Sequence, residues 1–78
     1  MADARQLLRT GRGPEALAAL DAIAREFPNG ALAQEREALA IEALRVSGRS
    51  AEARARATKF LTRYPASPHA SSVRRALE

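Results

Sequence analysis

Two stretches of the chain follow the same pattern: GRGPEALAALDAIAREFP at residues 11–28 and GRSAEARARATKFLTRYP at residues 48–65. Both begin with Gly-Arg and end with an aromatic residue followed by proline, and they lie 37 residues apart. The shared positions include turn glycines and the final prolines, where a helix ends because the residue before proline is pushed out of the α region. A period in this range is typical of helical repeat proteins.

Within each stretch, apolar residues recur at intervals of four, three and four positions, which places them on one face of a helix. These residues are Ala16, Leu20, Ile23 and Phe27 in the first stretch and Ala53, Ala57, Phe60 and Tyr64 in the second. Gly13 is predicted to be an N-cap with Pro14 as the first helical residue, and Ser50 is a favourable N-cap for the second stretch.

The chain as a whole predicts an all-α fold with five helices, at about 2–10, 14–27, 31–46, 50–64 and 68–77. Ser67-Pro68 provides the cap-then-proline signal that opens the last of them. The repeat favours a right-handed α-solenoid with two helix–turn–helix pairs, the first one truncated, and a final helix that would begin a third pair. We expect residues 1–78 to form one domain, as a fragment of or module in a longer protein.

The second helix of each pair resembles the tetratricopeptide repeat. In that family a turn residue, a small residue, two inward side chains and a proline follow one another, as Gly48, Ala53, Ala57, Phe60 and Pro65 do here. The stretch YPASPHA at residues 64–70 is similar to long-period repeats of bacterial cell-envelope proteins, of the outer-membrane assembly lipoprotein and periplasmic cell-division coordinator type. The resemblance implies a periplasmic or membrane-associated bacterial protein, with the cytoplasm left open as an alternative.

The resemblance also implies a function, because the first helix of each pair in this family lines a concave groove that binds a peptide or protein partner. We therefore expect a non-catalytic protein–protein interaction scaffold. The expected groove residues are Arg5, Arg9, Glu35, Ala38, Glu42, Arg45, Ser72 and Arg75. Ordinary solvation of a polar helix face explains Glu35, Glu42 and Arg45 equally well. The chaperone-tail members of the family use Lys and Asn where this chain has Ala38 and Glu42, so clamping of a peptide carboxylate there is not expected.

The amino-acid composition excludes several classes of function. The chain has no Cys, which excludes disulfides and a thiol nucleophile, and only one His, which is too few for a metal site. His69 stands beside Ser67, Ser71 and Ser72, but no orienting acid or nucleophile elbow accompanies it, so helix capping is favoured over a catalytic triad. No signal peptide and no apolar run of the roughly 20 residues needed to span a bilayer is present. We expect no enzyme and no cofactor.

The net charge of +4 is uneven, with −1 in residues 1–39 and +5 in residues 40–78. The spacing places Arg56, Lys59 and Arg63 on one helix face, with Glu52 positioned to pair with Arg56. This candidate basic face would suit an anionic membrane surface or an acidic protein, although a solvated outer face is favoured. Nucleic acid is not expected, because base stacking needs exposed aromatic side chains.

Self-association is a further candidate function. Two helix pairs leave both ends of a solenoid uncovered, and arrays usually need three or more repeats. Leu8, Leu17, Leu39 and Val46 are the apolar residues that are hardest to place inside five helices. The sequence therefore favours a binding surface, either for another protein or for a second copy of this chain.

Overall fold

The computed structural model describes residues 2–26 and 32–78, and this part of the chain is helical with no strands. Five α-helices and one closing turn of 3-10 helix follow one another: α1 (Ala2–Arg9), α2 (Gly13–Glu26), α3 (Ala33–Val46), α4 (Ser50–Arg63), α5 (Ala70–Arg74) and η1 (Arg75–Leu77). The all-α prediction with five helices is thus confirmed for the described residues.

The last helix begins two residues later than predicted. The hydroxyl of Ser67 accepts a hydrogen bond from the backbone N–H of His69 at 3.1 Å, and the carbonyl of Ser67 accepts one from the N–H of Ala70 at 3.0 Å. These bonds close a turn, so α5 starts at Ala70. The hydroxyl of Ser67 therefore stabilises the turn before α5, where the sequence predicted a cap immediately before Pro68.

The predicted start of α1, end of α3 and start of α4 are confirmed, and the other described helix ends differ from prediction by at most two residues. Ser50 was predicted as the N-cap of α4, but it is already the first helical residue. The N-cap is Arg49, which makes no side-chain cap bond. Likewise α2 begins at Gly13, one residue before Pro14. The expected boundaries at residues 27 and 31 lie outside the described part of the chain.

The turns after α1 and α3 have the same backbone geometry. Gly11 and Gly48 both have φ of +78°. The N–H of Arg12 donates to the carbonyl of Leu7 at 2.7 Å, and 37 residues later the N–H of Arg49 donates to Leu44 at 3.0 Å. This is the Schellman arrangement, in which a residue in the left-handed region closes a helix. A glycine is preferred there because a Cβ is strained at positive φ.

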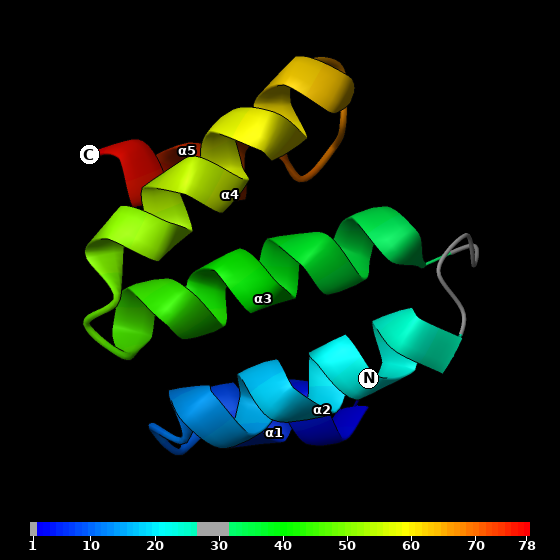
Figure 1. The fold of residues 1–78 in the computed structure, drawn as a ribbon, viewed down its shortest axis with the longest axis vertical. Helices are drawn as coiled ribbons and strands as arrows, with labels where there is room; N and C mark the ends of the chain where they lie inside the picture. Colours follow the sequence, from blue (N-terminus) through cyan, green and yellow to red (C-terminus); the bar gives the residue numbers. More distant parts are fainter. Residues whose placement is uncertain (1, 27–31) are drawn as a thin grey trace.

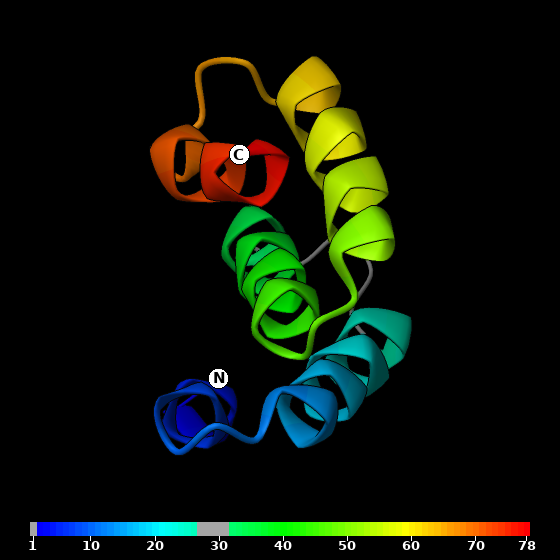
Figure 2. The same cartoon turned by 90° about the vertical axis from the view of Figure 1, so that its left-hand side faces the viewer.

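The helices stack in chain order, with α3 between α2 and α4 (Figure 1) and in contact with every other helix. Figure 2 shows two layers, with α1, α3 and α5 on one side and α2 and α4 on the other. No helix in residues 2–26 or 32–78 combines the length and the apolar character that crossing a membrane requires.

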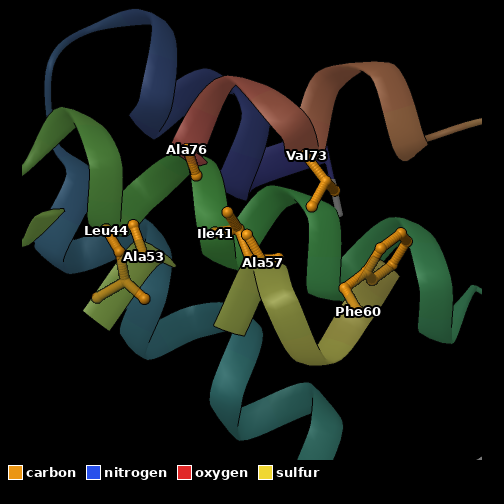
Figure 3. Close-up of a cluster of buried hydrophobic side chains, with 7 residues drawn as sticks. All are labelled: Ile41, Leu44, Ala53, Ala57, Phe60, Val73 and Ala76. Atoms are coloured by element: carbon orange, nitrogen blue, oxygen red, sulfur yellow. The ribbon is translucent and has the colours of Figure 1, made fainter. Parts of the chain in front are cut away.

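The main core lies where α3, α4, α5 and η1 meet. Figure 3 shows its fully buried side chains, which are Ile41, Leu44, Ala53, Ala57, Phe60, Val73 and Ala76. A smaller cluster pairs Leu20 of α2 with Ala40 of α3. The inward positions predicted from the spacing are largely confirmed, although Ile23 is only half-buried and Phe27 lies outside the described residues. Burying a Leu or Phe side chain contributes roughly 1.5–3 kcal/mol, so these few residues carry much of the stability.

Two of the leucines that were hard to place belong to this core. Leu17 packs against both clusters, and Leu39 packs against Leu20 and Ala40. Leu8 is also partly buried, but Val46 is 47% exposed. Of the four residues suggested for self-association, only Val46 is therefore largely available to a second copy.

Candidate functional site

A concavity opens between α1, α3 and α5, with a volume of about 330 Å³. We call it the groove; its lining residues are Arg5, Glu35, Ala38, Leu39, Glu42, His69, Ser72 and Arg75. Six of the eight residues predicted for a partner-binding groove therefore lie around one concavity. The helical spacing places Glu35, Ala38 and Glu42 on one face of α3, and the packing of α1 and α5 beside α3 supplies the two walls.

The acidic residues of the groove are paired within the chain. Arg5 of α1 forms an ion pair with Glu35 of α3, which ties one wall to the base. Glu42 pairs with Arg45 one turn later on α3, and the Nε of Arg45 donates to the Glu42 carboxylate at 3.1 Å. The hydrogen bond with Glu42 raises the pKa of Arg45. Arginine is charged at neutral pH with or without this shift, so the raised pKa is a consequence of the pairing.

Arg75 differs from the other cations of the groove. It has no ion-pair partner among the described residues, and its side chain is exposed beside Ser72. The base between the walls includes Ala38 and Leu39, which are small or apolar and half-buried. The groove therefore offers an apolar base, two internally paired acids and one cation that is available to a ligand.

Two predicted groove residues lie elsewhere. Arg9 is exposed at the end of α1 and does not line the groove. Arg45 pairs with Glu42 and lines a mainly polar hollow of about 360 Å³ beside η1, together with Ser50 and Arg54. Arg75 lines both this hollow and the groove. The resemblance placed Arg9 and Arg45 by their repeat position, which does not specify how far along a helix the concavity extends.

His69 lines the groove, but it is not organised as a catalytic residue. No hydrogen bond or ion pair joins its ring to a serine or carboxylate in the described residues. Ser67 accepts a bond from the backbone of His69 and so has a structural task. In residues 2–26 and 32–78 no group of three or more His, Asp or Glu side chains is placed to hold a metal ion.

The candidate basic face lines a second pocket, of about 230 Å³, between α2, α3 and α4. We call it the α2–α4 pocket. Arg56, Lys59 and Arg63 all contribute to it, as their spacing on α4 predicted. The predicted pairing of Arg56 with Glu52 is wrong: Glu52 pairs with Arg49, at 2.7 Å.

Arg56 instead bridges three helices. Its Nε and a terminal nitrogen donate to the Glu37 carboxylate of α3 at 2.8 and 2.9 Å, and Asp21 of α2 lies at 3.6 Å. The bond to Glu37 is the main reason that the pKa of Arg56 is raised. Bidentate Arg–carboxylate geometry is the strongest form of such contacts, so Arg56 is held in place and is not available to a partner.

Sequence reasoning missed several lining residues. Leu39 lies four positions after Glu35 and three before Glu42 on α3, so the periodicity of that helix could have included it. His69 could have been found as the residue before Ala70 at the start of the last helix. Asp21 and Glu37 could not have been found from the sequence, because they contact Arg56 only through the packing of separate helices.

Comparison with models of known protein families, with curated proteins and with solved structures gives no match to this chain. The tetratricopeptide-like resemblance therefore stays a prediction, supported by the residues that suggested it. The functional argument has to come from the groove and from the α2–α4 pocket.

Proposed function

We propose that this chain is a non-catalytic protein-interaction module, a tetratricopeptide-like α-solenoid whose groove receives an extended segment of a partner protein. The observation that carries the proposal is a convergence of side chains from α1, α3, α5 and η1 on one concavity; they are Arg5, Glu35, Ala38, Ser72 and Arg75. Pockets with an apolar base and a few polar groups are the usual form of binding sites. The matching Schellman turns after α1 and α3 support the repeat on which the solenoid rests.

The groove chemistry suggests what the partner segment carries. Ala38 and Leu39 suit a small apolar side chain. Arg75 suits a carboxylate of the same segment, since neither Glu35 nor Glu42 is paired with it. We therefore expect segments that combine an Asp or Glu with a small aliphatic residue.

The test is selection of peptides from a displayed random library against the purified chain, followed by measurement of their affinity for two variants. Ser71 and Ser72 are adjacent and both exposed on α5, but only Ser72 lines the groove. A large side chain in Ser72→Trp should obstruct the groove and weaken binding at least about tenfold, which corresponds to about 1.4 kcal/mol. Ser71→Trp adds the same group outside the groove and should bind like wild type.

A charge-swapped variant tests the electrostatic contribution of the groove to peptide binding. Exchanging the pair by Glu42→Arg with Arg45→Glu keeps composition and net charge while reversing the polarity of this part of the groove. Because the swap replaces an acid that lines the groove with a cation, selected peptides that carry an Asp or Glu should bind this variant more tightly than wild type. Peptides that bind wild type, the Trp variants and the swapped pair equally would place the binding surface outside the groove and overturn the proposal.

A second candidate function is self-association, which the exposed large apolar residues favour. Leu32 is 50% exposed, Val46 is 47% exposed and Leu77 is 42% exposed. Light scattering over a concentration series tests this, with Val46→Glu and Leu77→Glu as disrupting variants. A monomer at every concentration would remove self-association as a function of the isolated chain.

A further inference from the structure

The α2–α4 pocket has an apolar interior. Leu20, Ala40 and Phe60 line it and are each no more than 2% exposed. Ala24 of α2 and Ala33 of α3 leave space beside them, because neither side chain extends beyond Cβ. This pocket lies among α2, α3 and α4, whereas the groove lies among α1, α3 and α5, and no lining residue is common to the two. It is therefore a separate site, and its chemistry does not depend on the proposed protein partner.

The charges around this pocket are unbalanced. Its lining residues include four cationic and two anionic side chains, which leaves two positive charges in excess; they are Arg36, Arg56, Lys59 and Arg63 against Asp21 and Glu37. Both carboxylates converge on Arg56. Arg36 is buried, so the exposed cations of the lining are Lys59 and Arg63, further along α4.

Lys59 and Arg63 are one turn apart on α4, and neither makes an ion pair with a described residue. The Arg63 guanidinium lies 5.3 Å from the centre of the Tyr64 ring. That ring is in turn 5.2 Å from Phe60. The aromatic pair thus connects the cationic rim to the apolar interior.

We propose that the α2–α4 pocket binds a small carboxylate with a short apolar body. The carboxylate pairs with Lys59 and Arg63 at the rim, and the apolar body lies against Leu20 and Phe60. Asp21 and Glu37 sit at the Arg56 end and would repel an anion there, which fixes the orientation. A volume of about 230 Å³ corresponds to roughly eight water-sized groups. Hexanoate, with six carbons and two oxygens, is a probe of this size.

The chain carries its own reporter for the test. Tyr64 lines the pocket, and it is the single Tyr of a sequence that has no Trp. Titration with hexanoate should change the tyrosine fluorescence in a saturable way. Acetate has the charge without the apolar body, and hexanol has the apolar body without the charge. Acetate and hexanol should each bind at least about tenfold more weakly than hexanoate, because each lacks one of the two contacts.

Two matched variants locate the site. Lys59→Gln with Arg63→Gln removes the rim cations, and it should weaken hexanoate binding by about tenfold, the value expected for two partly exposed ion pairs. Arg54→Gln with Arg74→Gln removes the same charge from exposed positions outside this pocket and should leave the affinity unchanged. Ala24→Phe, which fills the interior, should abolish binding while circular dichroism shows an unchanged helix content.

A peptide terminus presents the same chemistry as a free carboxylate. An acetylated peptide ending in leucine, compared with its C-terminal amide, separates the two sources. Binding of hexanoate or of the acid peptide, with loss in the rim variant, supports the proposal. No saturable signal with either probe, or equal affinity of acetate and hexanoate, or equal affinity of both charge variants, would overturn it.

Discussion

Replacing Gly13 with Ala is the sharpest test of how the two helix pairs meet. A Cβ at Gly13 would lie 2.9 Å from the carbonyl oxygen of Ala43 and 3.1 Å from Cγ2 of Val46, and it would overlap the hydroxyl of Ser47. Gly13 starts α2, whereas the other three residues belong to the end of α3 and the turn that follows. The glycine is therefore required by close helix approach.

The expected cost follows from two opposing effects. Overpacking costs about 1–3 kcal/mol, because a backbone carbonyl cannot move aside as a side chain can. Replacing glycine by alanine in a helix stabilises the folded state by at most about 1 kcal/mol. The net loss should be about 1–2 kcal/mol. A chain of this size has a total stability of roughly 4–12 kcal/mol, and its melting temperature should fall by about 4–16 °C.

Urea and thermal unfolding followed by far-ultraviolet circular dichroism measure this difference. Gly11→Ala and Gly48→Ala are the comparisons, since a Cβ there meets nothing within 4 Å and only the φ of +78° is unfavourable. Each should lose about 1 kcal/mol, and the two losses should be alike. Ser47→Ala should restore part of the stability of Gly13→Ala. A Gly13→Ala variant as stable as wild type would refute the packing of α2 on α3 described here.

Four further substitutions test the core and the ion pairs by the same unfolding measurement. Arg56→Met should destabilise the chain by about 1–2 kcal/mol, because the carboxylate of Glu37 loses its bidentate partner. Its control is Arg54→Met, at an exposed position of the same helix, which should change stability by less than about 0.5 kcal/mol. Equal effects would mean that the bridge contributes nothing. Leu44→Ala should cost about 2–5 kcal/mol, because Leu44 is 1% exposed. Val46→Ala should cost less than about 0.5 kcal/mol, and a larger loss would show that Val46 is buried in solution.

The features that could be predicted from the sequence are those that depend on neighbouring residues. Gly11 and Gly48 indicated helix ends because a left-handed residue is needed to close a helix. Ala53, Ala57 and Phe60 indicated a buried face because helical spacing brings them together. Such local rules do not place one helix against another, so the extent of the groove along α3 became visible only in the structure.

The wrong prediction that Glu52 pairs with Arg56 shows the same limit of local rules. Glu52 is within reach of Arg49 on one side and Arg56 on the other, so the sequence alone offers two equivalent partners. The choice is made by Glu37, which lies on another helix and accepts two hydrogen bonds from Arg56, one from Nε and one from a terminal nitrogen. Glu52 is left with Arg49. A tertiary contact therefore decided a pairing that looked purely local.

The repeat also separates the residues that build the fold from those that give each pocket its chemistry. Shifting by 37 residues matches the buried Ala16 with the buried Ala53, but it matches Lys59 with Ala22 and Arg63 with Glu26. The cationic rim of the α2–α4 pocket thus belongs to one copy only, and the packing shared by both copies does not require it. Changes in these charges should therefore alter ligand binding without unfolding the chain. For that reason a loss of binding in the rim variant, with stability retained, would identify a function and not a damaged fold.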